Sequence, residues 1–204
     1  MPEKTVQKEP GKKPAPSKKP KPQQEVVVQI PLSELHPFPD HPFQVREDAS
    51  MQETAESVKE YGVLVPALAR PREDGGYELI AGHRRKHACE LAGLATMPVI
   101  VRDIDRDAAT IIMVDSNLQR ENILPSERAK AYKMKMEAIK RQGARTDLTS
   151  PKISAKFRSD DEVGQDAGVS GDTIRNYIAL TQLVPELQQM VDEKKIALSP
   201  AYQI

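Results

Sequence analysis

The segment 77–93 constrains the fold of this chain more than any other stretch. Its apolar beginning, Tyr77–Ile80, predicts a β-strand, and the basic, alanine-containing residues after it predict a helix that ends at the next glycine. Gly82 lies between the two, where the N–H groups of a helix start carry a partial positive charge. Arg84 and Arg85 add cations that can bind an anion in a bidentate manner. The segment therefore predicts a phosphate site, although a glycine before a solvated basic helix is also a common arrangement.

Strands and helices alternate along the first half of the chain. Apolar and β-branched runs predict strands at Val26–Ile30, Val63–Ala69, Tyr77–Ile80 and Met97–Val101. Ser50, with Glu53 completing a capping box, predicts the start of a helix, and Gly62 predicts its end. The proline-rich stretch His36–Phe43 predicts an ordered loop rather than a regular element. This alternation predicts a small α/β domain over residues 25–123.

No strand is predicted after Leu124, so residues 124–204 are expected to form a helical domain. Helices are predicted at residues 125–142, 151–157 and 185–195, with a further one beginning at Ser199. Gly164, Gly168 and Ile174 are spaced four and six residues apart, as in a helix-turn-helix with its glycine in the turn. This spacing favours DNA binding, but other three-helix units also produce it.

Charge is distributed unevenly along the chain. The formal net charge is zero, yet residues 130–158 contain nine Lys or Arg and two acids, just before the helix-turn-helix. Phosphate contacts with DNA are expected there. The second helix is expected to face solvent at Ser170, Gly171, Asp172, Arg175 and Asn176. The residues predicted to contact DNA are Ser170, Gly171, Thr173, Arg175 and Asn176, together with Lys152, Lys156 and Arg158. Arg175 and Asn176 are candidates for reading guanine and adenine, whereas the acidic residues 160–162 are expected to face away or to cap a helix.

Several classes of protein are disfavoured by composition. No apolar run reaches the length of a membrane span, and the N-terminus lacks the apolar stretch of a signal peptide. The single cysteine, Cys89, excludes an internal disulfide framework and fits a reducing cytosol, so a cytoplasmic protein is expected. Residues 1–24 are rich in Lys, Pro and Gln and are predicted to be disordered, as a solubilising tail or as a docking arm.

Six motifs, taken in order, resemble those of the ParB partition family, which includes nucleoid-occlusion relatives. They are Pro31–Leu35, Gly62–Pro66, Ala81–Arg85, Asn117–Glu121, Leu124–Glu127 and the helix-turn-helix. Each motif is weak alone, but their common order and spacing, from about Val27 to the last residue, make the resemblance specific. It implies an α+β chain, with a small ParB/sulfiredoxin-like α/β domain followed by an all-α helix-turn-helix domain.

The function implied by this resemblance is that of a homodimeric clamp that binds a centromere-like DNA palindrome. It would use CTP and Mg²⁺ to close around DNA and slide. Residues matching the family's nucleotide motifs are Arg46, Val65, Pro66, Gly82, His83, Arg84, Arg85, Ala88, Ser116, Asn117, Arg120 and Glu121. Asn117 would contact Mg²⁺, and Gln44 and Glu121 are the catalytic candidates. A ParA-type ATPase would bind the tail Lys4–Lys21. Members normally continue into a dimerisation domain, so this chain is expected to be truncated or to dimerise otherwise.

Two acidic positions of the family motifs are changed in this chain. His83 stands where most members have Glu in Gly-Glu-Arg-Arg, and Ser116 stands where they have Glu before Asn117. In addition, Val65 replaces the usual Gln before a proline. A carboxylate helps to position a cation and the attacking water, and neither His nor Ser replaces its charge. We therefore expect nucleotide binding with hydrolysis that is slow, altered or supported by Glu121.

Two other functions are consistent with parts of the sequence. A sulfiredoxin-type enzyme shares the α/β fold and a Gly-His-Arg motif, but its chemistry needs a cysteine beside the histidine. Here Ala81 and Gly82 precede His83, and Cys89 comes six residues later. Nothing in the sequence excludes a transcription regulator whose α/β domain binds no nucleotide, or a nucleoid-occlusion-type factor that hydrolyses none. Binding of labelled CTP, ATP, GTP and UTP distinguishes a regulator that binds no nucleotide from the clamp.

Overall fold

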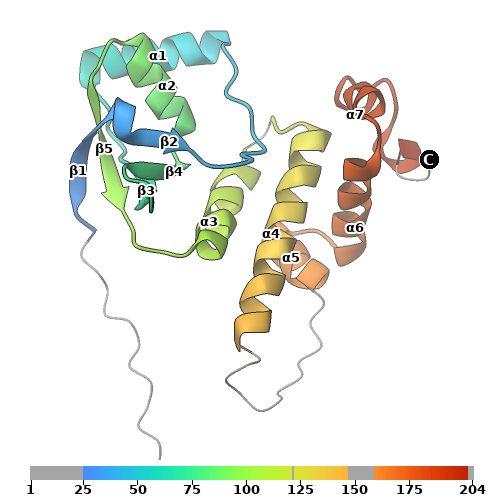
Figure 1. The fold of residues 1–204 in the computed structure, drawn as a ribbon. Coiled ribbons are helices and arrows are strands. Elements are labelled where there is room, and N and C mark those ends of the chain that lie inside the picture. Colours follow the sequence, from blue (N-terminus) through green and yellow to red (C-terminus); the bar gives the residue numbers. More distant parts are fainter. Residues whose placement is uncertain (1–24, 121, 147–158, 202–204) are drawn as a thin grey trace, which may run out of the picture.

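A computed structural model describes residues 25–120, 122–146 and 159–201 of the chain. In Figure 1 a β-sheet with helices α1 and α2 at one end is joined through α3 to a group of helices that contains α4–α7. The predictions made for the tail 1–24, the helix 151–157, Glu121, Lys152, Lys156 and Arg158 lie outside the described residues. None of the helices within the described ranges is long and apolar enough to cross a membrane.

The sheet has five strands in the order β1-β5-β3-β4-β2. The strands are β1 (Val27–Pro31), β2 (Leu35–Pro37), β3 (Ala67–Pro71), β4 (Tyr77–Ala81) and β5 (Thr96–Val101), with a 3₁₀ turn at Leu32–Glu34. β1 pairs with β5 and β3 with β4 in antiparallel fashion, whereas β3–β5 and β2–β4 are parallel. The alternation predicted from the sequence is therefore confirmed.

The sequence prediction is wrong at two of the strands, β2 and β3. His36 and Pro37 belong to β2, not to a loop, because β2 is the edge strand next to β4, where a residue without an N–H is tolerated. β3 begins at Ala67 rather than Val63, and the apolar residues before it are exposed, with Leu64 at 79%. The carbonyls of Val65 and Pro66, just before β3, instead accept hydrogen bonds from Arg85 of α2. An apolar run therefore does not by itself predict a strand.

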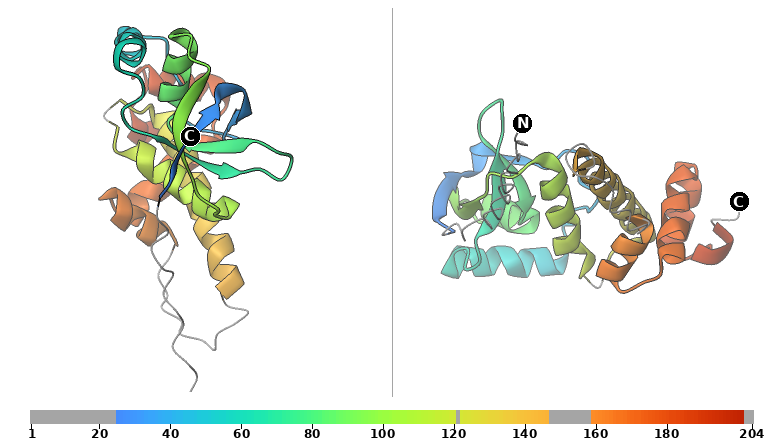
Figure 2. Two further views of the ribbon diagram at one scale, coloured as in Figure 1. Left: turned by 90° about the vertical axis from the view of Figure 1, so that its left-hand side faces the viewer. Right: turned by 90° about the horizontal axis from the view of Figure 1, so that it is seen from below.

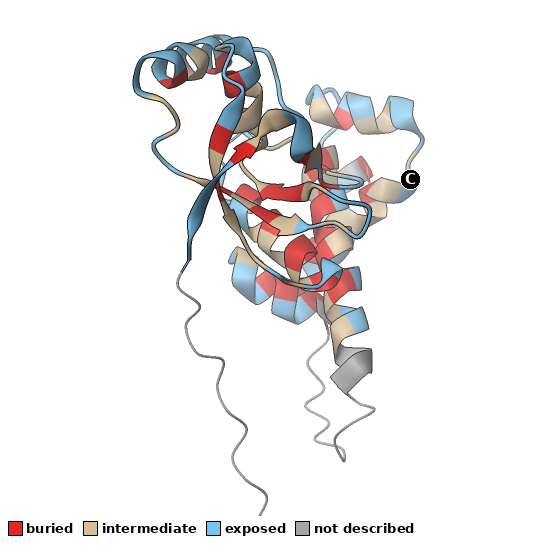
Figure 3. Cartoon of the chain, turned by 60° about the vertical axis from the view of Figure 1, so that its left-hand side comes forward, coloured by how far each residue is buried: buried red, intermediate tan, exposed pale blue. Residues whose placement is uncertain are grey.

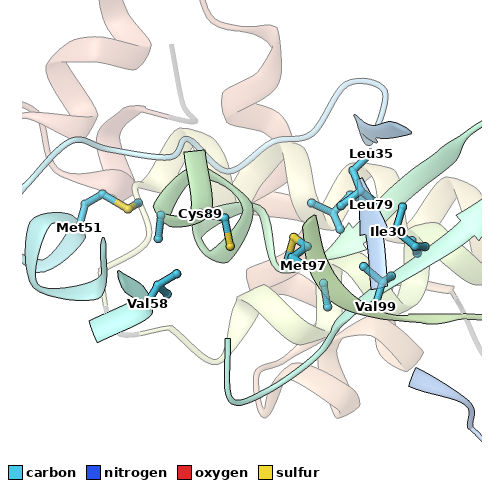
Figure 4. Packing of buried hydrophobic residues seen from close by; sticks show 11 residues of the cluster. Ile30, Leu35, Met51, Val58, Leu79, Cys89, Met97 and Val99 are labelled. Atoms are coloured by element: carbon cyan, nitrogen blue, oxygen red, sulfur yellow. The ribbon is translucent and has the colours of Figure 1, made fainter. Parts of the chain in front are cut away.

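Two helices cover one part of the sheet, α1 (Ala49–Tyr61) and α2 (His83–Leu91). The residue that caps α1 is Asp48 rather than the predicted Ser50, since the Asp48 carboxylate accepts the Met51 N–H at 2.9 Å. Gly62 ends α1 as predicted. Figure 4 shows the core between these helices and the sheet, including Met51, Val58, Leu79, Cys89, Met97 and Val99. Burial raises the pKa of the Cys89 thiol, which is fully buried and unsuited to the redox chemistry of a sulfiredoxin.

Helices α3 (Arg106–Leu118) and α4 (Pro125–Thr146) connect the sheet to the rest of the molecule. Figure 2 (right) places both between the sheet and the last helices. One buried cluster combines Ile80 of β4, Met113 and Val114 of α3 and Ala131 of α4, and Figure 3 shows buried residues along both the strands and the helices. α4 continues past the predicted end at Gln142 to Thr146, so the glycine at 143 does not stop it.

The predicted helix-turn-helix is present. It consists of α5 (Ser159–Ala167) and α6 (Gly171–Ala179), followed by a 3₁₀ turn (Leu180–Gln182), α7 (Pro185–Asp192) and α8 (Leu198–Ala201). Gly168 in the turn has φ +68°, which favours glycine. A Cβ at Gly164 would lie 2.6 Å from the Val169 carbonyl oxygen, so a small residue is required where the segments meet. Tyr132 of α4 packs with Val163 and Ile174 in the core of this unit.

Candidate functional site

A cleft of about 380 Å³ lies where the loop before α1, the start of α2 and the start of α4 meet. Its lining consists of Phe43, Gln44, Arg46, Asp48, Ser50, Arg84, Arg120, Asn122, Ile123 and Glu127. Four of these, namely Gln44, Arg46, Arg84 and Arg120, are residues that the sequence assigns to the nucleotide site. The first and the last of them, Gln44 and Arg120, are separated by more than seventy residues in the chain. The fold thus brings three arginines and one glutamine to a single opening.

Gly82 allows α2 to begin against the neighbouring strand. It has φ +110°, and a Cβ there would lie 2.8 Å from the Cβ of Ala67 in β3. A side chain at this position would be both strained and overlapping. The glycine therefore sets how closely the positive end of α2 approaches β3, and with it the position of Arg84 at the cleft.

The two consecutive arginines of α2 have different roles. Arg84 donates from Nη2 to the Ser50 hydroxyl at 3.2 Å and lies 3.7 Å from the Asp48 carboxylate, so it faces the cleft. Arg85 turns the other way and donates from Nη1 to the backbone carbonyls of Val65 and Pro66, at 2.6 Å each. Burial lowers the pKa of Arg85. Arg85, Val65 and Pro66 thus form one unit that does not line the cleft.

Glu127 in the first turn of α4 is a cleft residue that the sequence reasoning did not assign. It is 7% exposed, and its carboxylate accepts the Gln44 N–H and the Leu124 N–H, each at 3.1 Å. Arg46 Nη2 lies 3.8 Å from the same carboxylate. The signal was present in the Leu-Pro-Ser-Glu motif, but the partner Gln44 is 83 residues away in the sequence. Glu127 therefore joins the loop of the α/β domain to the start of α4.

The electrostatics of the cleft favour an anion. Burial, followed by the charge of Arg84, lowers the pKa of Arg120, and Glu127 offsets only part of this effect. A lowered arginine pKa means that the protonated side chain is held near other positive charge with less water than usual. A bound anion relieves both penalties. The chemistry of the cleft is therefore that of phosphate or carboxylate binding.

Other predicted nucleotide residues lie outside the lining of the cleft. Ala88 is fully buried in the core. The Ser116 hydroxyl and the Asn117 amide nitrogen both donate to the Met113 carbonyl, at 3.0 and 2.8 Å, and Asn117 is 3% exposed. His83 begins α2 but packs against another histidine instead of facing the opening. The structure therefore collects some of the predicted set at the cleft and places the rest in the scaffold around it.

The second helix of the helix-turn-helix differs from prediction at two points. Ser170 caps α6 by accepting the Thr173 N–H at 3.2 Å. The expectation that Gly171 faces solvent is wrong, because Gly171 is buried and a Cβ there would lie against the Asp161 carboxylate. In α5, Asp160 does not face away, since it forms an ion pair with Arg175. Asp161 and Glu162 are exposed, and all three acids lie in the first turn of α5, which agrees with the alternative of a place at a helix start.

Arg175 is thus held by two carboxylates, those of Asp160 in α5 and Asp172 in α6. Asp172 is largely exposed, whereas Asp160 is buried. Asn176 is partly exposed and is not part of this ion-pair cluster, so it remains the simpler candidate for reading a base.

Comparison with known proteins agrees with this architecture. Residues 16–118 match the family described as the ParB N-terminal domain. The chain is 35% identical to the chromosome-partitioning protein Spo0J of Thermus thermophilus, over 86% of this chain and 58% of that protein. It is 38% identical to the probable chromosome 1-partitioning protein ParB of Deinococcus radiodurans, over 78% and 49% of the two chains. The chain therefore belongs to the ParB family, and it spans about half the length of these relatives.

Solved structures give the same result for the fold. The chain is similar to C-terminally truncated ParB of Caulobacter crescentus complexed to the centromeric parS site, with a TM-score of 0.56 and 27% identity. The match covers 86% of this chain and 82% of that one. A pNOB8-like ParB N-domain superposes with a TM-score of 0.59 at 18% identity, over 88% of this chain and 79% of that one, and shares the fold.

Proposed function

We propose that this chain is a DNA-partition protein that binds a centromere-like palindrome through α5 and α6 and binds CTP in the cleft. The resemblance to the ParB family implies that CTP would switch a homodimer associated with the nucleoid into a sliding clamp. The observation that carries the proposal is the cleft itself, in which Gln44, Arg46, Arg84 and Arg120 meet the first turn of the DNA-binding half. The Thermus thermophilus and Deinococcus radiodurans relatives are chromosome-partitioning proteins, and the similar ParB of Caulobacter crescentus was solved with its centromeric site.

The cleft offers separate cationic groups for more than one phosphate of a nucleotide. Three guanidinium groups line it, and two carboxylates, Asp48 and Glu127, balance part of their charge. The arginines present planar donors that match phosphate oxygens. Glu127, in the first turn of α4, also accepts the N–H of Gln44. A nucleotide that contacts Gln44 would therefore be connected to the start of α4 through Glu127. This connection gives the nucleotide a route to influence the DNA-binding half.

The described residues do not form a ready Mg²⁺ site at the cleft. Within the described parts of the chain, no group of three or more His, Cys, Asp or Glu could hold a metal ion. Mg²⁺ is commonly held by one or two protein oxygens and the phosphates of the substrate. Asn117, the Mg²⁺ contact that the resemblance implies, is 3% exposed, donates its amide nitrogen to the Met113 carbonyl at 2.8 Å, and does not line the cleft. A Mg²⁺ ion would therefore depend mainly on the phosphates of the nucleotide.

Arg84→Ala is expected to weaken CTP binding about tenfold or more, because it removes a charge-assisted contact with the phosphates. Equilibrium binding of labelled CTP, ATP, GTP and UTP to the full chain measures this effect. Arg72→Ala is the matched control, since Arg72 pairs with Asp74 away from the cleft. Equal affinities for the two variants would contradict the assignment of the cleft. No binding of any nucleotide by the wild-type chain would favour a regulator that uses DNA alone.

Asn176→Ala is expected to lower the affinity for a selected DNA duplex by about 1 to 3 kcal/mol while leaving non-specific binding unchanged. The duplexes are those that the wild-type chain enriches from a random-sequence pool, and the unselected pool reports non-specific binding. Arg175 is less suitable for this test, because its substitution also breaks the contacts with Asp160 and Asp172. Gln52→Ala, exposed on α1, is the control. An equal loss on both kinds of DNA would mean that Asn176 reads no base.

The remaining parts of the proposal rest on the resemblance. Residues Lys4–Lys21 are the candidate docking arm for a ParA-type ATPase, and their deletion is the corresponding experiment. Gln44 is the candidate for orienting the attacking water, together with Glu121. Hydrolysis is expected to be slow or altered, because His83 and Ser116 replace two acids of the family motifs.

A further inference from the structure

Two histidines that are far apart in the sequence stack beside the proposed nucleotide site. His41 belongs to the loop between β2 and α1, and His83 is the first residue of α2. Their ring centroids are 3.9 Å apart and the ring planes are inclined by 44°. The Nδ1 atom of His41 lies 2.7 Å from the Phe43 carbonyl oxygen. Both rings are largely removed from water, and their Nε2 atoms are buried without a hydrogen-bond partner.

The chemistry of this pair is that of two neutral rings. A carbonyl oxygen only accepts, so Nδ1 of His41 carries the hydrogen and its Nε2 holds the lone pair when the ring is neutral. Burial lowers the pKa of His41. Burial also lowers the pKa of His83 to about 3, and the nearby charges of His41, Arg120 and Lys86 lower it further. Two charged rings at this separation would repel each other. The stack is therefore an apolar contact at physiological pH.

The loop that carries Gln44 is anchored at three successive points. The His41 ring packs on His83, the Phe43 side chain is 4% exposed within the second core cluster, and the Gln44 N–H donates to Glu127. The hydrogen bond from His41 to Phe43 links the first two points. Without the first anchor, only the Phe43 side chain and the Gln44 N–H fix this part of the loop. Loops fixed at fewer points lose the precise placement that a catalytic or binding side chain requires.

We propose that the His41–His83 stack is a positioning device for Gln44 and Arg46 in the nucleotide site. His83 then acts through the loop and is not a general base, although it stands at the position of a family acid. The inference deepens the proposed function and rests on it. It also gives a reason for a histidine in the motif, because an aromatic ring at position 83 supplies a face on which His41 can pack.

A set of four variants of the full chain tests this role: His83→Ala, His41→Ala, the double variant and His83→Phe. Two quantities are measured, namely the equilibrium binding of labelled CTP and the amide hydrogen exchange of residues 38–48. Each alanine variant is expected to weaken CTP binding about three- to tenfold and to speed exchange in this segment, as expected for the loss of an aromatic pair. The double variant is expected to match the single variants within about twofold, because the two residues act through one contact.

The phenylalanine variant separates positioning from chemistry. His83→Phe keeps a ring and removes every titratable atom, so it is expected to retain wild-type exchange and CTP affinity within about twofold. A phenylalanine variant as impaired as His83→Ala, or alanine effects that add in the double variant, would overturn the proposal. If the wild-type chain binds no CTP, the proposed function fails, but the exchange data still test the stack. Unchanged exchange in all variants would then reject it separately.

Discussion

Gly82→Ala is expected to destabilise the chain by about 2 to 5 kcal/mol and to abolish measurable CTP binding. The residue has φ +110°, which side chains rarely adopt, and its new Cβ would meet the Cβ and Cα of Ala67 at 2.8 and 3.3 Å. Ala67 is fully buried in the central strand β3, so it has no space into which to move. The start of α2 must shift instead, and Arg84 shifts with it.

Gly93→Ala is the matched control for this substitution. Gly93 also has a positive φ of +74°, but a Cβ there would have nothing within 4 Å. Its replacement is therefore expected to cost only about 1 kcal/mol, the conformational part of the effect. Thermal or urea unfolding of both variants isolates the close approach to β3 as the difference between them. Similar losses in the two variants would show that backbone conformation alone explains the glycine.

The binding measurement is made at a temperature at which Gly82→Ala remains folded. CTP affinity reduced more than about tenfold, with unchanged far-UV circular dichroism, would place the effect at the cleft rather than in global unfolding. A folded variant with wild-type affinity would mean that the start of α2 does not belong to the nucleotide site.

The fold was largely predictable because its signals are local. The strand, glycine and helix at 77–93, the end of α1 at Gly62, and the spacing around Gly168 each depend on neighbouring residues, and the structure confirms all of them. Errors arose where two residues compete for one role. Asp48 and Ser50 can both cap a helix start, and only the geometry of the preceding loop decides between them.

The site was less predictable because its contacts join distant parts of the chain. Glu127 and Gln44 are 83 residues apart, and nothing in either local sequence indicates that a backbone N–H of one will meet the carboxylate of the other. The stack of His41 on His83 is similar, since each histidine alone gives no sign of a partner. In the same way, the pattern of α6 marks Arg175 as exposed but does not reveal that Asp160 of α5 already holds it. Periodicity predicts which face of an element is buried but not which side chains meet across elements.

Lys135 forms the contact whose loss is expected to affect the helical half most. It is 1% exposed in α4, and its ammonium group donates to Asp115 of α3 at 2.6 Å and to Asp166 of α5 at 2.8 Å. Burial alone would lower the pKa of Lys135, but the hydrogen bonds and charges of the two carboxylates outweigh it and raise the pKa. One cation therefore ties together the helix that carries Asn117, the long helix α4 and the first helix of the helix-turn-helix.

Lys135→Met is expected to lower the free energy of unfolding by about 2 to 3 kcal/mol and the melting temperature by about 5 to 10 °C. Methionine keeps most of the buried aliphatic side chain, so the loss of stability reports the ammonium group. The destabilisation stays moderate because Asp115 and Asp166 are about half exposed and can be hydrated when the ammonium is gone. Lys140→Met, at an exposed position of the same helix, is the control and is expected to change stability by less than about 0.5 kcal/mol.

The pH dependence of this difference gives a second check on Lys135. A lysine whose folded pKa is raised stabilises the fold fully below its unfolded pKa of about 10.4, and the contribution is lost as pH rises through the folded pKa. The stability gap between the wild-type chain and Lys135→Met is therefore expected to stay constant from about pH 7 to 9 and to narrow only above about pH 10.4. Urea unfolding at several pH values measures it. A gap that already closes near neutral pH would mean that another group carries the stabilisation, and that the link from α3 through α4 to α5 is not made by this ammonium.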